Sequence, residues 1–104
     1  MTIDGVSQTT VAERLVDVGS AADGLKLTIR AREPEAVLAS ATVPADGLMA
    51  VLTERPAGPQ AVGGDLVVEV RRNEVWLSLG GPDAAVGVDD MMDAVGGAVP
   101  RGEA

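Results

Sequence analysis

The sequence predicts an α+β domain with a four-stranded, mainly antiparallel sheet, two helices on one face of it, and a short N-terminal helix or strand. Four segments alternate apolar and polar residues with the period of two that half-buried strands show. Two others repeat apolar residues every three or four positions, as amphipathic helices do. Strand, strand and helix follow one another at 25–55 and again at 65–99, which indicates a tandem ββα pseudo-repeat.

The N-terminal segment 10–19 fits either a short helix or an edge strand. Thr10 and Glu13 have the spacing of a helix capping box, and apolar residues follow on one helical face. The run ERLVDV inside the same segment also fits a strand at the edge of a sheet. The helix is the favoured interpretation, and the edge strand is the alternative.

The first repeat unit contains the clearest strand of the chain. LKLTIRAR, 25–32, places four apolar residues on one face and four polar residues on the other. AVLASATV, 36–43, continues as the second strand of an antiparallel hairpin. A helix then begins near Pro44, because proline suits a first helical turn, and Leu48 and Leu52 lie on its apolar side.

The second unit follows a connector, 56–64, which is rich in Pro and Gly and has no periodicity. DLVVEVRR and NEVWLSLGG then alternate on either side of a tight turn at Arg72 and Asn73, so they predict two paired strands. A helix over 88–99 and a tail over 100–104 complete the chain. The two patterns together predict one shared core that contains Leu27, Ile29, Leu52, Val68, Val70, Leu77, Met92 and Val95.

Composition narrows the chemistry available to this single domain, 1–104. Cys and His are absent, which excludes disulfides, thiolate and imidazole catalysis, and most zinc sites. No secretory signal and no apolar run of roughly 20 residues is present, so we expect a cytoplasmic protein without contact to a membrane. The excess of Arg over Lys among many Ala, Gly and Val residues is common in GC-rich bacterial genomes.

Charge limits the class of partner. Sixteen acidic residues against eight basic ones give a net charge of −8, which opposes binding to nucleic acids and favours a basic partner. Four of the acids, Asp83, Asp89, Asp90 and Asp93, lie close together in sequence and raise the alternative of an Asp-dependent metal site. The spacing fits better with Asp89 and Asp90 at a helix start, where carboxylates stabilise the helix dipole. We therefore expect no bound metal and no cofactor.

The outer face of the sheet is the candidate binding surface. Period-two alternation turns Trp76, the only aromatic residue, away from the core, together with several basic side chains. Trp and Arg are enriched at protein-binding hot spots. The candidate partner-binding residues are Lys26, Arg30, Arg32, Val67, Arg71 and Trp76.

These features predict a non-enzymatic protein-interaction module, such as a small acidic regulatory or accessory protein of a bacterium or phage. Its partner would be another protein or a second copy of the chain, with a homodimer as the commonest arrangement. The alternative is a sheet domain that binds single-stranded nucleic acid, which would normally present several stacking aromatic residues.

Overall fold

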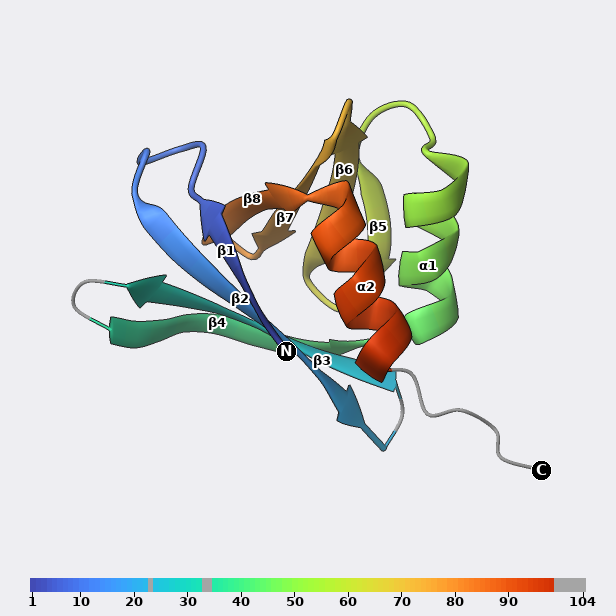
Figure 1. The fold of residues 1–104 in the computed structure, drawn as a ribbon, viewed down its shortest axis with the longest axis horizontal. Helices are drawn as coiled ribbons and strands as arrows, with labels where there is room; N and C mark the ends of the chain where they lie inside the picture. The colour runs from blue at the N-terminus through green and yellow to red at the C-terminus, as the bar shows by residue number, and fades with distance from the viewer. Residues whose placement is uncertain (23, 33–34, 99–104) are drawn as a thin grey trace.

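The computed structural model describes residues 1–22, 24–32 and 35–98, which form one antiparallel eight-stranded sheet and two helices (Figure 1). The strands are β1 Thr2–Val6, β2 Glu13–Ala21, β3 Gly24–Arg32, β4 Glu35–Val43, β5 Gln60–Gly63, β6 Leu66–Arg71, β7 Glu74–Leu79 and β8 Asp83–Gly87. The helices are α1 Ala45–Glu54 and α2 Val88–Ala98.

The chain passes twice through four strands followed by a helix. The order along the sheet is β4-β3-β2-β1-β8-β7-β6-β5, so each half is a meander of neighbouring strands. The halves join where β1 pairs with β8 at Val6 and Ala85. The sheet curls into a nearly closed barrel (Figure 1), and its two edge strands approach each other where Gly63 of β5 lies against Pro44, the residue after β4.

The hydrophobic core fills the inner side of this curled sheet. Leu48 and Leu52 of α1 and Met91 and Val95 of α2 belong to the same buried cluster as the inward side chains of the strands. The predicted shared core is confirmed, because all of its members belong to this cluster or pack against it: Leu27, Ile29, Leu52, Val68, Val70, Leu77, Met92 and Val95.

The predicted fold class is wrong, because the sheet has eight strands and is curled, where a four-stranded sheet with two helices on one face was expected. The four expected strands correspond to β3, β4, β6 and β7. The ββα units 25–55 and 65–99 do not match the order of elements either, because β8 stands between β7 and α2. The strands that were not predicted lack a clear alternation of apolar and polar residues, each for its own physical reason.

Segment 10–19 is a strand and not a helix. The Oγ atom of Ser7 accepts a hydrogen bond from the backbone N–H of Thr10, at 3.1 Å, so Thr10 belongs to a turn. Val11 follows with a left-handed φ of 53°, and β2 then begins at Glu13. The favoured helix is therefore wrong. The strand alternative is correct, except that β2 lies inside the sheet, between β1 and β3, and not at its edge.

Two further strands that were not predicted, β5 and β8, flank the second hairpin. The predicted connector 56–64 contains β5, which pairs with β6 despite its glycines. In β8 three successive residues are buried, Ala84, Ala85 and Val86, so no polar face marks the strand. Ala85 points outward and is the cross-strand neighbour of Trp76, which explains why the outer side of β8 is buried at this position.

Both predicted helices are confirmed within a few residues of their expected ends. α1 ends at Arg55, whose φ of 51° is left-handed and whose N–H donates to the carbonyl of Val51 at 3.0 Å. α2 starts directly after β8 and carries Asp89 and Asp90 in its first turn. The end of the predicted helix, Val99, and the tail 100–104 lie outside the described residues.

Candidate functional site

The six predicted binding residues all lie on the outer face of the sheet, but they form two separate groups. Lys26, Arg30 and Arg32 are on β3, whereas the others, Val67, Arg71 and Trp76, are on β6 and β7. Strands β2, β1 and β8 lie between β3 and β7. At the usual spacing of neighbouring strands, β3 and β7 are about 20 Å apart along the sheet, so one small ligand does not reach both groups.

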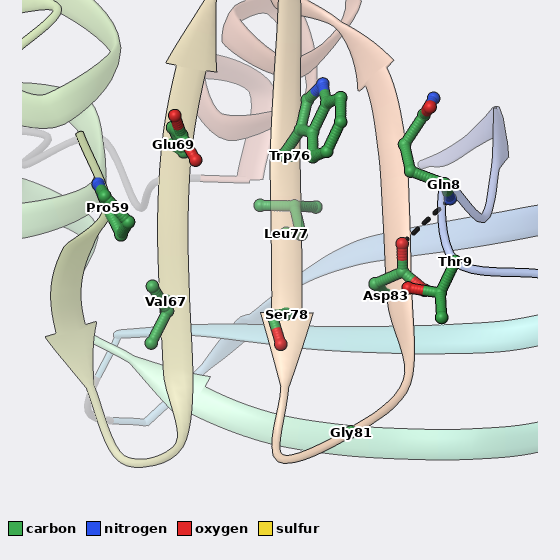
Figure 2. A pocket seen from close by; sticks show the side chains of 10 residues that line it. All are labelled: Gln8, Thr9, Pro59, Val67, Glu69, Trp76, Leu77, Ser78, Gly81 and Asp83. Carbon is green, nitrogen blue, oxygen red and sulfur yellow. Dashed lines mark hydrogen bonds between the residues drawn. The ribbon is translucent and has the colours of Figure 1, made fainter. Parts of the chain in front are cut away.

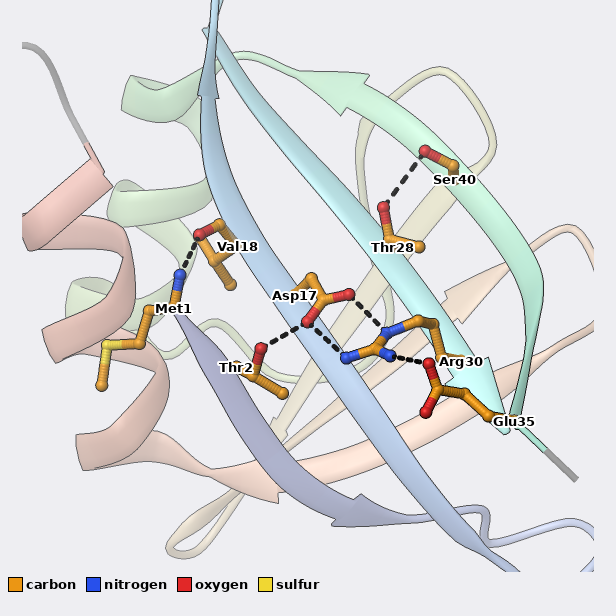
Figure 3. Close-up of polar contacts among 8 residues, drawn as sticks. All are labelled: Met1, Thr2, Asp17, Val18, Thr28, Arg30, Glu35 and Ser40. Atoms are coloured by element: carbon orange, nitrogen blue, oxygen red, sulfur yellow. Dashed lines mark hydrogen bonds and ion pairs between the residues drawn. The ribbon is translucent and has the colours of Figure 1, made fainter. Parts of the chain in front are cut away.

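Arg30 is held by carboxylates of the neighbouring strands (Figure 3). Its Nε and Nη2 donate to the two oxygens of Asp17 on β2, at 2.6 and 3.1 Å, and its Nη1 donates to Glu35 on β4, at 2.9 Å. Thr2 of β1 donates its hydroxyl to the same Asp17, at 2.6 Å. Burial raises the pKa of Asp17, but the bonds from Arg30 and Thr2 outweigh this effect and lower it below its ordinary value. Arg30 of β3 therefore links its own strand to β2 and to β4 through ion pairs.

The remaining basic residues of β3 do not make a cationic patch. Arg32 lies within 3.2 Å of Asp4 on β1 and 3.9 Å of Glu13 on β2, and all three side chains are largely exposed. Lys26 is exposed on the same strand. Because surface ion pairs contribute little to stability, the main effect of these acids is to neutralise the charge of the arginines.

Trp76 is the centre of the second group. Its register partners are Glu69 on β6 and Ala85 on β8, and its indole leans toward β8 (Figure 2). The guanidinium carbon of Arg71 lies 4.0 Å from the centroid of the Trp76 ring, which is the geometry of a cation–π contact. Glu69 accepts two bonds from Arg71, at 2.8 and 3.1 Å, and these bonds raise the pKa of Arg71. The predicted outward orientation of Trp76 is confirmed.

An open groove of about 370 Å³ runs over the outer face beside Trp76 (Figure 2). Its floor is formed by β6 and β7, one wall comes from the β1–β2 loop, and the other comes from the segment before β5. The residues that define it best are Gln8, Thr9, Pro59, Val67, Trp76 and Ser78, and we call it the Trp76 groove. Val67 is 37% exposed there, so the groove offers apolar surface to a ligand.

Asp83 anchors the loop that forms one wall of the Trp76 groove. The Ser7 hydroxyl, in a residue that is almost fully buried, donates to one oxygen of Asp83 at 2.7 Å. The backbone N–H of Gln8 donates to the other oxygen at 2.9 Å. Burial raises the pKa of Asp83, but the hydrogen bonds from Ser7, Gln8 and Thr9 lower it below the ordinary value of 3.8. Asp83 is therefore an ionised structural clamp.

We expect Asp83→Asn to loosen this wall and to lower the free energy of unfolding by about 1 kcal/mol, because charge-assisted hydrogen bonds are replaced by weaker ones. The pKa of Asp83 is lower in the folded protein than in the unfolded chain, so its stabilising contribution is complete above pH 3.8 and is lost as the pH falls below that value. Thermal melts at neutral and acidic pH measure this.

The control for the clamp is Asp89→Asn, which changes an exposed acid in the first turn of α2. We expect that variant to melt like the wild type at neutral pH, because Asn is also tolerated at a helix start. The difference in melting temperature between the wild type and Asp83→Asn should become smaller as the pH is lowered. A difference that stays constant with pH would contradict the assignment of Asp83.

The acidic residues that raised the metal alternative lie apart. Asp83 is on β8, whereas Asp89, Asp90 and Asp93 are on α2. In the ranges that the structure describes, no group of three or more His, Cys, Asp or Glu residues could hold a metal ion.

Reasoning from the sequence missed several groove residues, namely Gln8, Thr9, Pro59 and the clamp Asp83. They belong to a loop, a connector and a strand that carry no binding motif. Ser7 and Asp83 are 76 residues apart, so no local pattern could pair them.

Comparison of the chain with protein-family models, with curated proteins and with solved structures finds no match. Neither α1 nor α2 is long and apolar enough to cross a membrane.

Proposed function

We propose that this protein is a non-enzymatic interaction module whose Trp76 groove binds a segment of another protein. The observation that carries the proposal is the position of the only aromatic side chain, half-buried beside an open groove, with exposed Val67 diagonally opposite on the neighbouring strand β6. Tryptophan is the residue most enriched at binding hot spots, and an indole buried against a partner contributes about 2 kcal/mol or more.

The partner segment is expected to combine apolar and basic residues. Two carboxylates line the groove. Glu69 is neutralised by its ion pair with Arg71, whereas Asp83 accepts hydrogen bonds only from uncharged groups and keeps its negative charge. Among the described residues that line the groove there is no Lys or Arg. Arg71 at its border is already paired with Glu69. Together with the net charge of −8, this favours a cationic, apolar chain segment over an acidic one.

The same contacts argue against the alternative of a surface for single-stranded nucleic acid. Such surfaces combine an uncompensated positive groove with several stacking aromatic residues. Here Arg30, Arg32 and Arg71 have carboxylate partners, and one indole is available.

A displayed library of random peptides tests the proposal. We expect selection on the purified protein to enrich peptides with aliphatic residues and Lys or Arg. Because Trp76 is the only tryptophan, binding of a selected peptide should change the intrinsic fluorescence of the protein. Enrichment of acidic peptides, or a fluorescence spectrum that no selected peptide alters, would contradict the proposal.

Trp76→Ala should lower the affinity for the selected peptides about thirtyfold, which corresponds to the loss of about 2 kcal/mol of binding free energy. The far-UV circular dichroism should stay that of the wild type, because Trp76 lies outside the core cluster. Isothermal titration calorimetry measures the affinity. The matched control is Val37→Ala, which shortens an exposed apolar residue on β4 and should leave the affinity unchanged. Equal losses in both variants would contradict a specific role of Trp76.

A further inference from the structure

Strand β4 forms an edge of the sheet that is open except next to Pro44, where β5 approaches it. In the sheet order β4 is terminal and pairs with β3 on one side only. In an antiparallel ladder, half of the peptide groups of such a strand point away from its neighbour. Within the described residues, no backbone hydrogen bond from an element other than β3 reaches 35–43, so the outward-pointing peptide groups are available to a further strand.

The edge is uncharged over eight residues. Residues 36–43, AVLASATV, carry no charge, whereas charged residues make up 23% of the sequence. Val37 and Leu38 are 65% and 38% exposed, so two large apolar side chains lie in solvent next to each other on this edge. Edge strands that stay unpaired normally carry Lys or Pro, which block the approach of another chain. The one protective feature here is a bulge at Leu38, where the β3–β4 register shifts.

We propose that a second copy of this chain pairs with β4 through β4 of its own, antiparallel and about a two-fold axis near Ser40. With a net charge of −8, two copies repel each other over most of their surface, so a dimer contact must avoid acidic residues. The edge 36–43 meets this requirement.

The proposed register is self-complementary. With the axis at Ser40, that residue faces its own copy, Ala39 faces Ala41, and the exposed Leu38 faces Thr42. The facing side chains are small or apolar and none is charged, so directly opposite like charges are avoided. The contact is isologous, which closes the assembly at two subunits.

Single cysteines test this geometry cleanly, because the chain has no cysteine of its own. Directly opposite residues of an antiparallel pair have Cα atoms about 4.5–5.5 Å apart, which suits a disulfide. Ser40→Cys should therefore form a covalent dimer under mild oxidation. The control is Thr28→Cys on β3, whose hydroxyl lies 3.3 Å from that of Ser40 on the same outer face. In the proposed dimer the two Thr28 positions are about 14 Å apart, three strand spacings, and cannot be bridged.

A second measurement follows the mass in solution without cross-linking. The wild type should be a concentration-dependent dimer in sedimentation equilibrium, whereas Ser40→Lys should be monomeric with an unchanged circular dichroism spectrum, because it places two like charges opposite each other. A wild type that is monomeric throughout would overturn the proposal, as would equal cross-linking of both cysteine variants. So would a dimer that persists in Ser40→Lys and dissociates in Trp76→Ala, which would place the contact at the Trp76 groove. Peptide binding to that groove is measured separately and does not depend on this result.

Discussion

Replacing Leu77 by Ala is expected to lower the free energy of unfolding by about 2–5 kcal/mol, the largest effect that we expect from a single substitution. Leu77 is 2% exposed and lies on the inner side of β7, between its register partners Val68 on β6 and Ala84 on β8. Removal of its branched end leaves a cavity in the common cluster. The strands around it are held by their ladders and cannot move in to fill the space.

Urea-induced unfolding followed by circular dichroism measures this loss. The matched control is Leu38→Ala, the same change at an exposed position of β4. At protein concentrations below those at which the proposed β4 dimer forms, we expect a loss of less than about 0.5 kcal/mol. If both variants lose the same free energy, the inner position of Leu77 is contradicted. A selective loss in Leu77→Ala supports the assignment of the two faces of β7, and with it the outward position of Trp76.

Gly5→Ala is expected to destabilise the protein by about 1–3 kcal/mol, because it overpacks the seam between the two halves. A Cβ atom built on Gly5 would lie 2.6 Å from the carbonyl oxygen of Ala85 and 2.8 Å from the Cγ1 atom of Val86. The first of these atoms belongs to the backbone of β8 and cannot rotate away. The β1–β8 pairing at Val6 and Ala85 must therefore open.

The control for the seam is Gly19→Ala on β2, where an added Cβ meets nothing within 4 Å. We expect this variant to be as stable as the wild type or more stable by up to about 1 kcal/mol, because alanine restricts the unfolded chain. Thermal and urea unfolding of the two variants, side by side, give the comparison. Equal stability of Gly5→Ala and Gly19→Ala would mean that β1 and β8 do not approach closely.

The elements that the sequence predicted correctly have one property in common. Strands β3, β6 and β7 and the two helices each bury one face and expose the other, so their period appears directly in the residue types. In β4 the alternation appears only in the second half of the strand, where exposed residues alternate with half-buried ones. β8 buries both faces under α2 and Trp76, and β5 carries little apolar surface of its own. β1 has only Ile3 buried, so its pattern is too short to recognise.

The candidate site divides in the same way. Alternation along β7 was enough to turn Trp76 outward, and alternation along β6 placed Val67 on the same side. The sequence did not indicate that the basic residues of β3 lie far from Trp76 on the sheet. Their distance from Trp76 depends on the number of strands between β3 and β7, and two of those strands, β1 and β8, were not predicted.

By itself the sequence determined the local periods, the membership of the core, the lack of thiol and imidazole chemistry and the outward direction of Trp76, because each depends on neighbouring residues or on composition. The tertiary structure alone decided the eight-stranded curled sheet, the pairing of β1 with β8, the clamp between Ser7 and Asp83, and the groove that they border. These features join residues far apart in the chain. They form because particular strands pair to complete a common core. Which strands pair is determined by the free energy of the whole domain, to which all segments contribute.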